Sequence, residues 1–259
     1  MNKTGNYIQN KKNVLSIYLT ADYPEKGNTQ EVIIALQNAG ADLIEVGIPF
    51  SDPLADGKII QKSSQQSLNN GFKLDHLFED LKGIQKQVDI PLVLMGYFNT
   101  ALTYGMDRFL EACKSVGVDT LILPDLPLEI YLKKYHELFL DKGISPVFLI
   151  SPQTTEERIL QMEKASNAFI YAVADNSITG SNKEFSAGQL KYFERIQKLQ
   201  LSVPVLIGFG ISDHIAFRKA CEYAQGAIIG SAFIDALSGG GKLKETVTKF
   251  IKSIKNEEK

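Results

Sequence analysis

Short apolar runs alternate with longer helical patterns along the whole chain, and this alternation limits the fold more than any other feature. The runs are nearly continuous, which is typical of strands buried on both faces of a parallel sheet. Strands are predicted at 14–20, 42–46, 92–97, 118–123, 145–150, 168–173, 203–207 and 226–230. Eight strands, each followed by a helix, predict an α/β fold, a (β/α)8 or TIM barrel, with residues 1–259 in a single domain.

Capping residues predict where several helices begin and end. Asn28, Thr154 and Ser212 are expected to cap helices, the first two with a glutamate three residues later. Gly40 is expected to end the first of these helices, and a last helix is expected at 242–255.

Composition indicates a cytoplasmic protein with neither a nucleic-acid nor a membrane partner. The net charge of -2 gives no basic stripe, and the polar start of the chain lacks the apolar stretch of a signal peptide. No run reaches the ~18 apolar residues of a membrane span. Cys113 and Cys221 lie in helical patterns, which favours two reduced thiols over a disulfide.

An acidic loop follows the second predicted strand, where about 50 residues separate that strand's start from the next one. Glu45 ends the strand, and Asp52 and Asp56 lie in the loop with Pro49 and Pro53. A buried strand has no packing reason to hold a glutamate, because a desolvated carboxylate is costly unless it is paired or used. Glu45 and Asp56 are therefore candidate catalytic acids at the barrel mouth, and Asp52 is interpreted as a structural cap of the loop.

Glycines directly after the last two strands indicate a phosphate site. Gly208 and Gly210 follow the seventh strand, and Gly230 with Ser231 follows the eighth. Glycines that lead into helix N-termini let backbone N–H groups approach an anion, and barrels often bind phosphate here. The alternative is that they are only turn residues. No P-loop or Rossmann fingerprint is present, so the hypothesis is a phosphorylated metabolite rather than a dinucleotide.

The residues that are missing narrow the chemistry. His76, His136 and His214 all fall in predicted helices or helix starts, so a metal-dependent hydrolase or aldolase is disfavoured. No strand ends in lysine, and Lys58 is predicted to open a helix, so an imine-forming aldolase has no evident nucleophile. This leaves general acid–base catalysis by two carboxylates.

The sequence resembles the tryptophan synthase alpha chain family in motifs that run in order along nearly the whole chain. The most specific is EVGIPFSDPLADG at 45–57. Shorter motifs are YLTA from Tyr18, GYFN from Gly96, PDLP from Pro124, SITG from Ser177, GFGIS from Gly208 and GSA from Gly230.

The resemblance implies a lyase that splits indole-3-glycerol phosphate into indole and glyceraldehyde 3-phosphate by a retro-aldol step. Glu45 matches the general acid/base, and Asp56 matches the carboxylate that bonds the indole N–H. Tyr18 matches a position lining the indole pocket, while Tyr97 and Tyr171 match positions near the substrate, although each tyrosine is also compatible with a core role. The phosphate contacts and the mobile closing loop are matched by Gly180, Phe209, Gly210, Gly230, Ser231 and Thr179.

The resemblance also implies a partner. It is a beta chain that carries pyridoxal phosphate and receives indole through a tunnel, in an alpha2-beta2 heterotetramer, with no cofactor in the present chain. Docking would use the loop of Pro53 and Leu54 and residues 99–104. Lys58 and Asp22 depart from the family, which often has proline and glycine there.

Three alternatives stay open from the sequence. The chain could be a stand-alone lyase that releases free indole, or a regulatory subunit that no longer performs chemistry. It could also be a different phosphosugar isomerase or aldolase barrel, for which no strand-end lysine or histidine is found.

Overall fold

The computed structural model describes residues 1–53, 56–174, 185–208 and 210–256. The predicted site residues Thr179, Gly180 and Phe209, and Leu54 of the predicted docking loop, lie outside the described residues.

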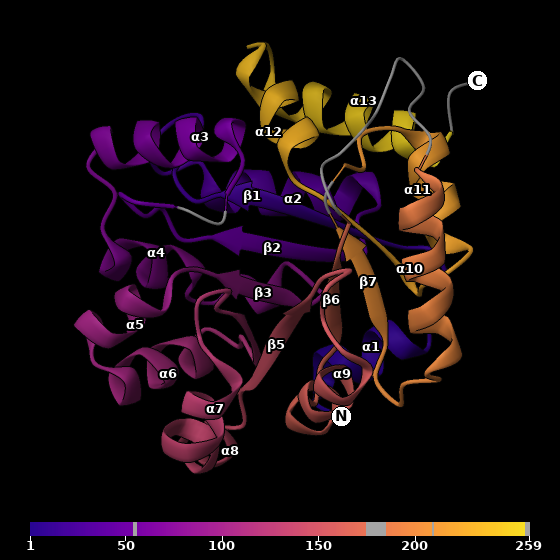
Figure 1. Cartoon of the computed structure of the whole chain (residues 1–259). Helices are drawn as coiled ribbons and strands as arrows, with labels where there is room; N and C mark the ends of the chain where they lie inside the picture. The colour runs from indigo at the N-terminus through magenta and orange to yellow at the C-terminus, as the bar shows by residue number, and fades with distance from the viewer. Residues whose placement is uncertain (54–55, 175–184, 209, 257–259) are drawn as a thin grey trace.

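Eight parallel strands close into a barrel in sequence order, with helices packed around it (Figure 1). The strands are β1 Val14–Thr20, β2 Leu43–Gly47, β3 Leu92–Met95, β4 Thr120–Ile122, β5 Ser145–Ile150, β6 Ile170–Val173, β7 Val205–Gly208 and β8 Gly226–Ile229. The predicted fold class is confirmed. Several strand ends are shorter than predicted; β3 ends at Met95 because Tyr97 is already the N-cap of the next helix.

The helical segments fill the intervals between strands. They are α1 Lys3–Gln9, α2 Thr29–Ala39, α3 Lys58–Asn69, α4 Leu74–Leu81, η1 Ile84–Lys86, α5 Phe98–Tyr104, α6 Met106–Ser115, α7 Leu128–Ile130, η2 Tyr131–Tyr135, α8 His136–Lys142, α9 Glu156–Ala165, α10 Ala187–Lys198, α11 His214–Cys221, α12 Ser231–Ser238 and α13 Leu243–Lys255. Among the described residues, none of these helices has the length and apolar character needed to cross a membrane.

Helix α1 was not predicted, and it packs against the end of the barrel where the strands begin. The backbone N–H of Asn2 donates to the carbonyl of Asn167 at 2.8 Å, and Ile8 joins the apolar cluster that includes Val14 and Leu43. A Cβ at Gly5 would lie 2.7 Å from the carbonyl oxygen of Asn167. The close approach therefore needs glycine, a signal that hydrophobic periodicity does not carry.

Two of the predicted caps are wrong by one residue, and a third lacks the expected hydrogen bond. Asn28 is the N-cap residue of α2, as predicted, but it has an αR backbone and makes no side-chain cap bond. Thr155, not Thr154, caps α9 by accepting from the Arg158 N–H, because the Thr154 hydroxyl is used in the preceding turn, where it accepts from the Ser151 N–H at 2.9 Å. Asp213, rather than Ser212, caps α11 by accepting from the Ala216 N–H.

Two other local predictions are confirmed. Gly40 ends α2 in the left-handed region, with φ of 104°. The last helix, α13, spans Leu243–Lys255 as expected. Cys113 is buried and Cys221 is half-buried, and both are free thiols.

Candidate active site

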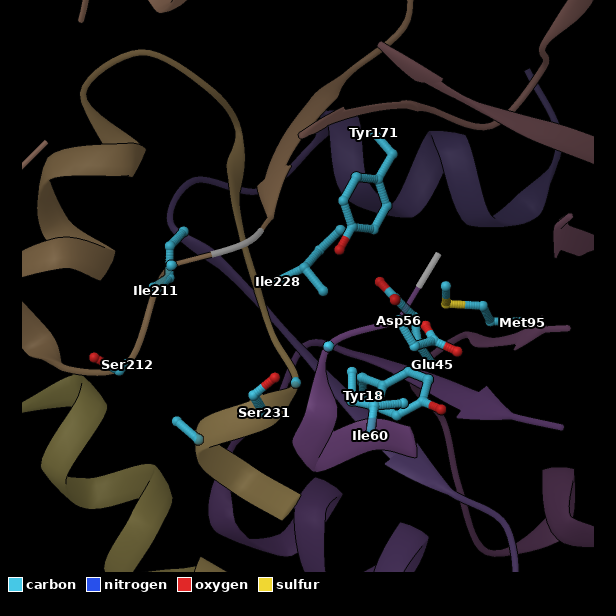
Figure 2. A pocket seen from close by; sticks show the side chains of 14 residues that line it. Tyr18, Glu45, Asp56, Ile60, Met95, Tyr171, Ile211, Ser212, Ile228 and Ser231 are labelled. Atoms are coloured by element: carbon cyan, nitrogen blue, oxygen red, sulfur yellow. The ribbon is translucent and has the colours of Figure 1, made fainter. Parts of the chain in front are cut away.

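A cavity of about 200 Å³ opens at the end of the barrel where the strands finish. Two carboxylates from the acidic loop region lie in it together with residues that follow β7 and β8, as Figure 2 shows. The lining residues are Tyr18, Glu45, Asp56, Gly57, Ile60, Met95, Tyr171, Gly210, Ile211, Ser212, Ile228, Gly230, Ser231 and Ala232. The structure thus brings together predicted residues that are far apart in the sequence.

Glu45 is fully buried on β2, at 0% exposure. The hydroxyl of Ser16 on β1 donates to its Oε1 at 2.9 Å. Its Oε2 is also buried and has no hydrogen-bond partner within the described part of the chain. Burial raises the pKa of Glu45 to about 8, against the opposing effect of the Ser16 hydrogen bond. A carboxyl group of this pKa holds a proton near neutral pH and can give it up there.

Asp56 lies directly before α3, whose N-cap is Gly57. The hydroxyl of Tyr97 donates to its Oδ2 at 3.2 Å. Tyr97 is held in turn by the ring of Phe50, with ring centroids 4.7 Å apart and planes at 19°. Burial raises the pKa of Asp56 to about 6, and the Tyr97 hydrogen bond opposes this shift. Tyr97 is not among the residues that line the cavity; its contact with the site is the hydrogen bond to Asp56.

Two tyrosines enter the cavity because glycines on the next strand make room for them. A Cβ at Gly47 would collide with the ring and hydroxyl of Tyr18, and one at Gly208 would collide with those of Tyr171. Each glycine lies two residues beyond the tyrosine's register partner, Glu45 for Tyr18 and Leu206 for Tyr171. Burial raises the pKa of both tyrosines far above the ordinary value, so both hydroxyls stay protonated.

The opposite side of the cavity is formed by backbone and small side chains. Gly210 has a φ of 74°, a conformation that favours glycine. Gly230 precedes α12 without any side-chain cap, and Ser231 is the first residue of that helix. Uncapped N–H groups at a helix N-terminus, next to glycine backbone, can bind an anion. Gly210 can therefore serve as a turn residue and also contribute to anion binding, because its left-handed backbone lies at the cavity.

The remaining predicted residues have mainly local roles. Asp52 is exposed and accepts a hydrogen bond from the Ser51 hydroxyl at 2.5 Å. Lys58 is the exposed first residue of α3, as predicted. Asp22 has a φ of 57°, and its Oδ1 accepts from the Gly27 N–H at 2.9 Å. Left-handed backbone is the physical reason that glycine suits the position of Asp22.

Sequence reasoning missed several residues of the site, namely Ser16, Phe50, Ile60, Met95, Ile211 and Ile228. A signal existed for Ser16 alone: it lies two residues before Tyr18 on one strand, so both side chains point to the same face. The apolar members are typical of core positions and carry no local sign of a ligand.

The site can therefore perform proton transfer at one side while it holds an anion at the other. Two carboxyl groups with pKa values raised to about 8 and about 6 face an apolar cavity. Within the described ranges no group of three histidine, cysteine or acidic side chains could hold a metal ion.

Comparison with known proteins gives one consistent family. The family model for the tryptophan synthase alpha chain matches residues 5–259. The tryptophan synthase alpha chain of Christiangramia forsetii is 48% identical over 255 residues, which cover 98% of this chain and 99% of that one. The alpha chain of Flavobacterium johnsoniae is 49% identical over 249 residues, covering 95% and 98% of the two chains.

Solved structures agree with the sequence relatives. A chain of the tryptophan synthase complex from Pyrococcus furiosus is similar with a TM-score of 0.86 at 33% identity, covering 95% of this chain and 99% of that chain. A chain of the aminoacrylate-bound tryptophan synthase from M. tuberculosis is similar with a TM-score of 0.85 at 26% identity, covering 98% of both.

Proposed function

The chain belongs to the tryptophan synthase alpha chain family, and on that premise we propose that Glu45 and Asp56 carry out its reaction. This reaction is the cleavage of indole-3-glycerol phosphate to indole and glyceraldehyde 3-phosphate, a step of L-tryptophan biosynthesis. The observation that carries the assignment is a pair of carboxyl groups with raised pKa values at one apolar cavity, Glu45 fully buried and Asp56 half-buried.

Glu45 acts as general acid and then as general base. Its protonated carboxyl delivers a proton to C3 of the indole ring, which leaves positive charge at the ring nitrogen. The resulting carboxylate then accepts the proton of the neighbouring glycerol hydroxyl. As that C–O becomes a carbonyl, the carbon–carbon bond breaks and its electron pair returns to the indole ring. Oε2 of Glu45 has no hydrogen-bond partner in the described part of the chain, which supports this role, because a group that exchanges protons with substrate needs a free oxygen.

Asp56 accepts the indole N–H and stabilises the charge that develops on that nitrogen. This role needs the ionised form, and a pKa of about 6 leaves Asp56 ionised at neutral pH. Tyr97 supports it by donating to Oδ2, which leaves Oδ1 for the substrate. Tyr18 on β1 and Tyr171 on β6 line the same cavity and contact the indole ring there.

The phosphate binds at the opposite side of the cavity. Gly210, Gly230 and Ser231 supply backbone N–H groups and a hydroxyl there. Gly180 and Phe209 complete the phosphate contacts, and Thr179 belongs to the segment that closes over the substrate.

The partner is a beta chain that holds pyridoxal phosphate, in an alpha2-beta2 heterotetramer in the cytoplasm. The similarity to a chain of the tryptophan synthase complex from Pyrococcus furiosus supports a partnered subunit. Pro53, Leu54 and residues 99–104 form the docking surface; Leu102 on α5 is 43% exposed, which suits a contact site.

Indole production from indole-3-glycerol phosphate, with and without a beta chain, tests the proposal. Glu45→Gln keeps the shape of the side chain but cannot transfer a proton, so turnover is expected to fall by ~10²-fold or more. Near-normal turnover in this variant would remove Glu45 from its role. High activity without a partner would instead favour a stand-alone lyase, and a well-folded but inactive chain that still activates the beta chain would favour a regulatory subunit.

A further inference from the structure

Ser16 occupies an unusual place for a hydroxyl. It lies in the middle of β1, fully buried, and its register partners are Leu43 on β2 and Ile228 on β8. Val14, two residues earlier on the same face, belongs to an apolar cluster with both partners. Burying a hydroxyl among such side chains costs free energy unless it is hydrogen-bonded. The hydrogen bond that offsets this cost goes to Glu45, 29 residues away in the sequence.

This hydrogen bond makes the two oxygens of Glu45 inequivalent. Oε1 accepts from the Ser16 hydroxyl at 2.9 Å, whereas Oε2 is buried and unpartnered among the described residues. The terminal torsion of a glutamate is broad, so an unanchored carboxyl group could rotate and exchange its oxygens. A hydroxyl that donates to Oε1 favours the acid form with its proton on Oε2.

We propose that Ser16 is a positioning residue for the lyase reaction: its hydroxyl fixes the carboxyl plane of Glu45 so that Oε2 alone exchanges the proton with the substrate. The proposal rests on the proposed role of Glu45. Ser16 itself is not among the residues that line the cavity, so it acts through Glu45 and not by contact with the substrate.

Substitution of Ser16 tests this separately from folding. In Ser16→Ala, kcat for indole formation is expected to fall about 10-fold, because misorientation of a catalytic group costs rate. KM is expected to change less than about 2-fold, since no substrate contact is lost. The alkaline apparent pKa of the rate profile is expected to rise by about one unit, because a donor to the ionised carboxylate has been removed.

Two companion variants show whether the hydroxyl or the volume matters. Ser16→Thr keeps the donor and is expected to restore both kcat and the alkaline pKa to within about 2-fold and a few tenths of a unit. Ser16→Cys keeps the volume but donates weakly, so it is expected to behave like Ser16→Ala even where the alanine variant folds poorly. Tyr18, Asp56 and Tyr171 line the same cavity as Glu45, and all three are unchanged in these variants.

Ser145 provides a matched control. It is another buried serine on a strand, and its hydroxyl accepts from the Asn167 N–H at 2.7 Å. Ser145→Ala is expected to lower Tm without a change in the pH profile of kcat.

The outcomes separate this inference from the assignment of Glu45. If Glu45→Gln is inactive while Ser16→Ala has the wild-type kcat and pH profile, Ser16 is not a positioning residue although Glu45 keeps its role. If Ser16→Thr loses as much activity as Ser16→Ala, the hydroxyl is irrelevant and the proposal fails. An active Glu45→Gln variant removes both assignments together.

Discussion

The two ends of the barrel treat carboxylates in opposite ways. At the end where the strands begin, Asp119 accepts the backbone N–H of Thr4 at 3.2 Å, the hydroxyl of Thr4 at 2.5 Å and the hydroxyl of Thr120 at 2.9 Å. At the opposite end, Glu45 receives one hydrogen bond on Oε1 and none on Oε2 within the described residues. Both oxygens of Asp119 accept hydrogen bonds, whereas one oxygen of the buried Glu45 accepts none within the described part of the chain.

The difference separates a structural carboxylate from a reactive one. Donors around Asp119 join α1 to β4, so this group contributes to stability. Glu45 is buried with few hydrogen bonds, so its charged form is costly and its pKa is raised. The raised pKa suits proton transfer, but the ionised carboxylate lowers the stability of the folded protein. Substitution of Asp119 should therefore change thermal stability, whereas substitution at the carboxyl groups of the cavity should change kcat and its pH dependence.

Asp56→Asn should have a large effect on catalysis, comparable to that expected of Glu45→Gln. The variant loses the charge that stabilises the indole nitrogen, so kcat is expected to fall about 10²-fold. In the wild type, kcat/KM should rise with pH through about 6, as Asp56 ionises, and fall through about 8, as Glu45 loses its proton. The acid limb should be absent from the residual activity of the variant.

A control for Asp56 exists in the same loop. Asp52 is exposed and lies outside the cavity lining, so Asp52→Asn should keep both limbs of the profile. Because the substrate's phosphate also titrates near pH 6, an acid limb that persists in Asp56→Asn would assign it to the substrate and not to the enzyme.

Asp119→Ala should have the next largest effect, and on stability alone. Two donors of Thr4 and one of Thr120 lose their acceptor, which should cost about 2–3 kcal/mol of unfolding free energy. Thermal unfolding should show a Tm lower by several degrees, with kcat per folded molecule unchanged. Asp119→Asn keeps one acceptor oxygen, so its free energy of unfolding should fall less than that of Asp119→Ala. A loss of kcat in Asp119→Ala as large as that in Asp56→Asn would contradict the division between the two ends of the barrel.

Glu45→Gln should have a small effect on stability near pH 5, and it should be stabilising at high pH. The folded-state pKa of about 8 lies above the ordinary value of 4.5, so between these pH values the folded state holds a proton that the unfolded state has lost. The wild type is therefore expected to lose stability as pH rises from about 4.5 to about 8, whereas the variant lacks this loss. The difference expected at pH 9 is about 5 kcal/mol, because the pKa rises from 4.5 to about 8 and each pH unit between them contributes about 1.4 kcal/mol.

Thermal unfolding of wild type and variant across pH 5–9 measures this difference. Glu194 is exposed on α10, so Glu194→Gln should follow the wild-type curve at every pH. A Glu45→Gln curve parallel to that of the wild type would mean that burial does not raise the pKa of Glu45.

Much of the fold could be predicted because it depends on local patterns. A nearly continuous apolar run must be buried on both faces, and eight such runs with intervening helices leave the closed barrel as the consistent solution. Exact ends could not be predicted in the same way. The apolar run that forms β3 continues into the start of α5, and hydrophobicity alone does not distinguish a strand end from a buried helix start.

The sequence by itself determined the barrel strands, Glu45 on β2 with Asp56 in the loop that follows, and the glycines that follow β7 and β8, because each of these is encoded within one short segment. Only the tertiary structure decided that Ser16 meets Glu45, that Tyr97 meets Asp56 and that Gly47 makes room for Tyr18. These contacts join different strands, and desolvation of a carboxyl group exists only once the barrel has closed around it. Sequence can therefore name the acids, while the assembled barrel sets their pKa values and leaves one oxygen of Glu45 without a partner among the described residues.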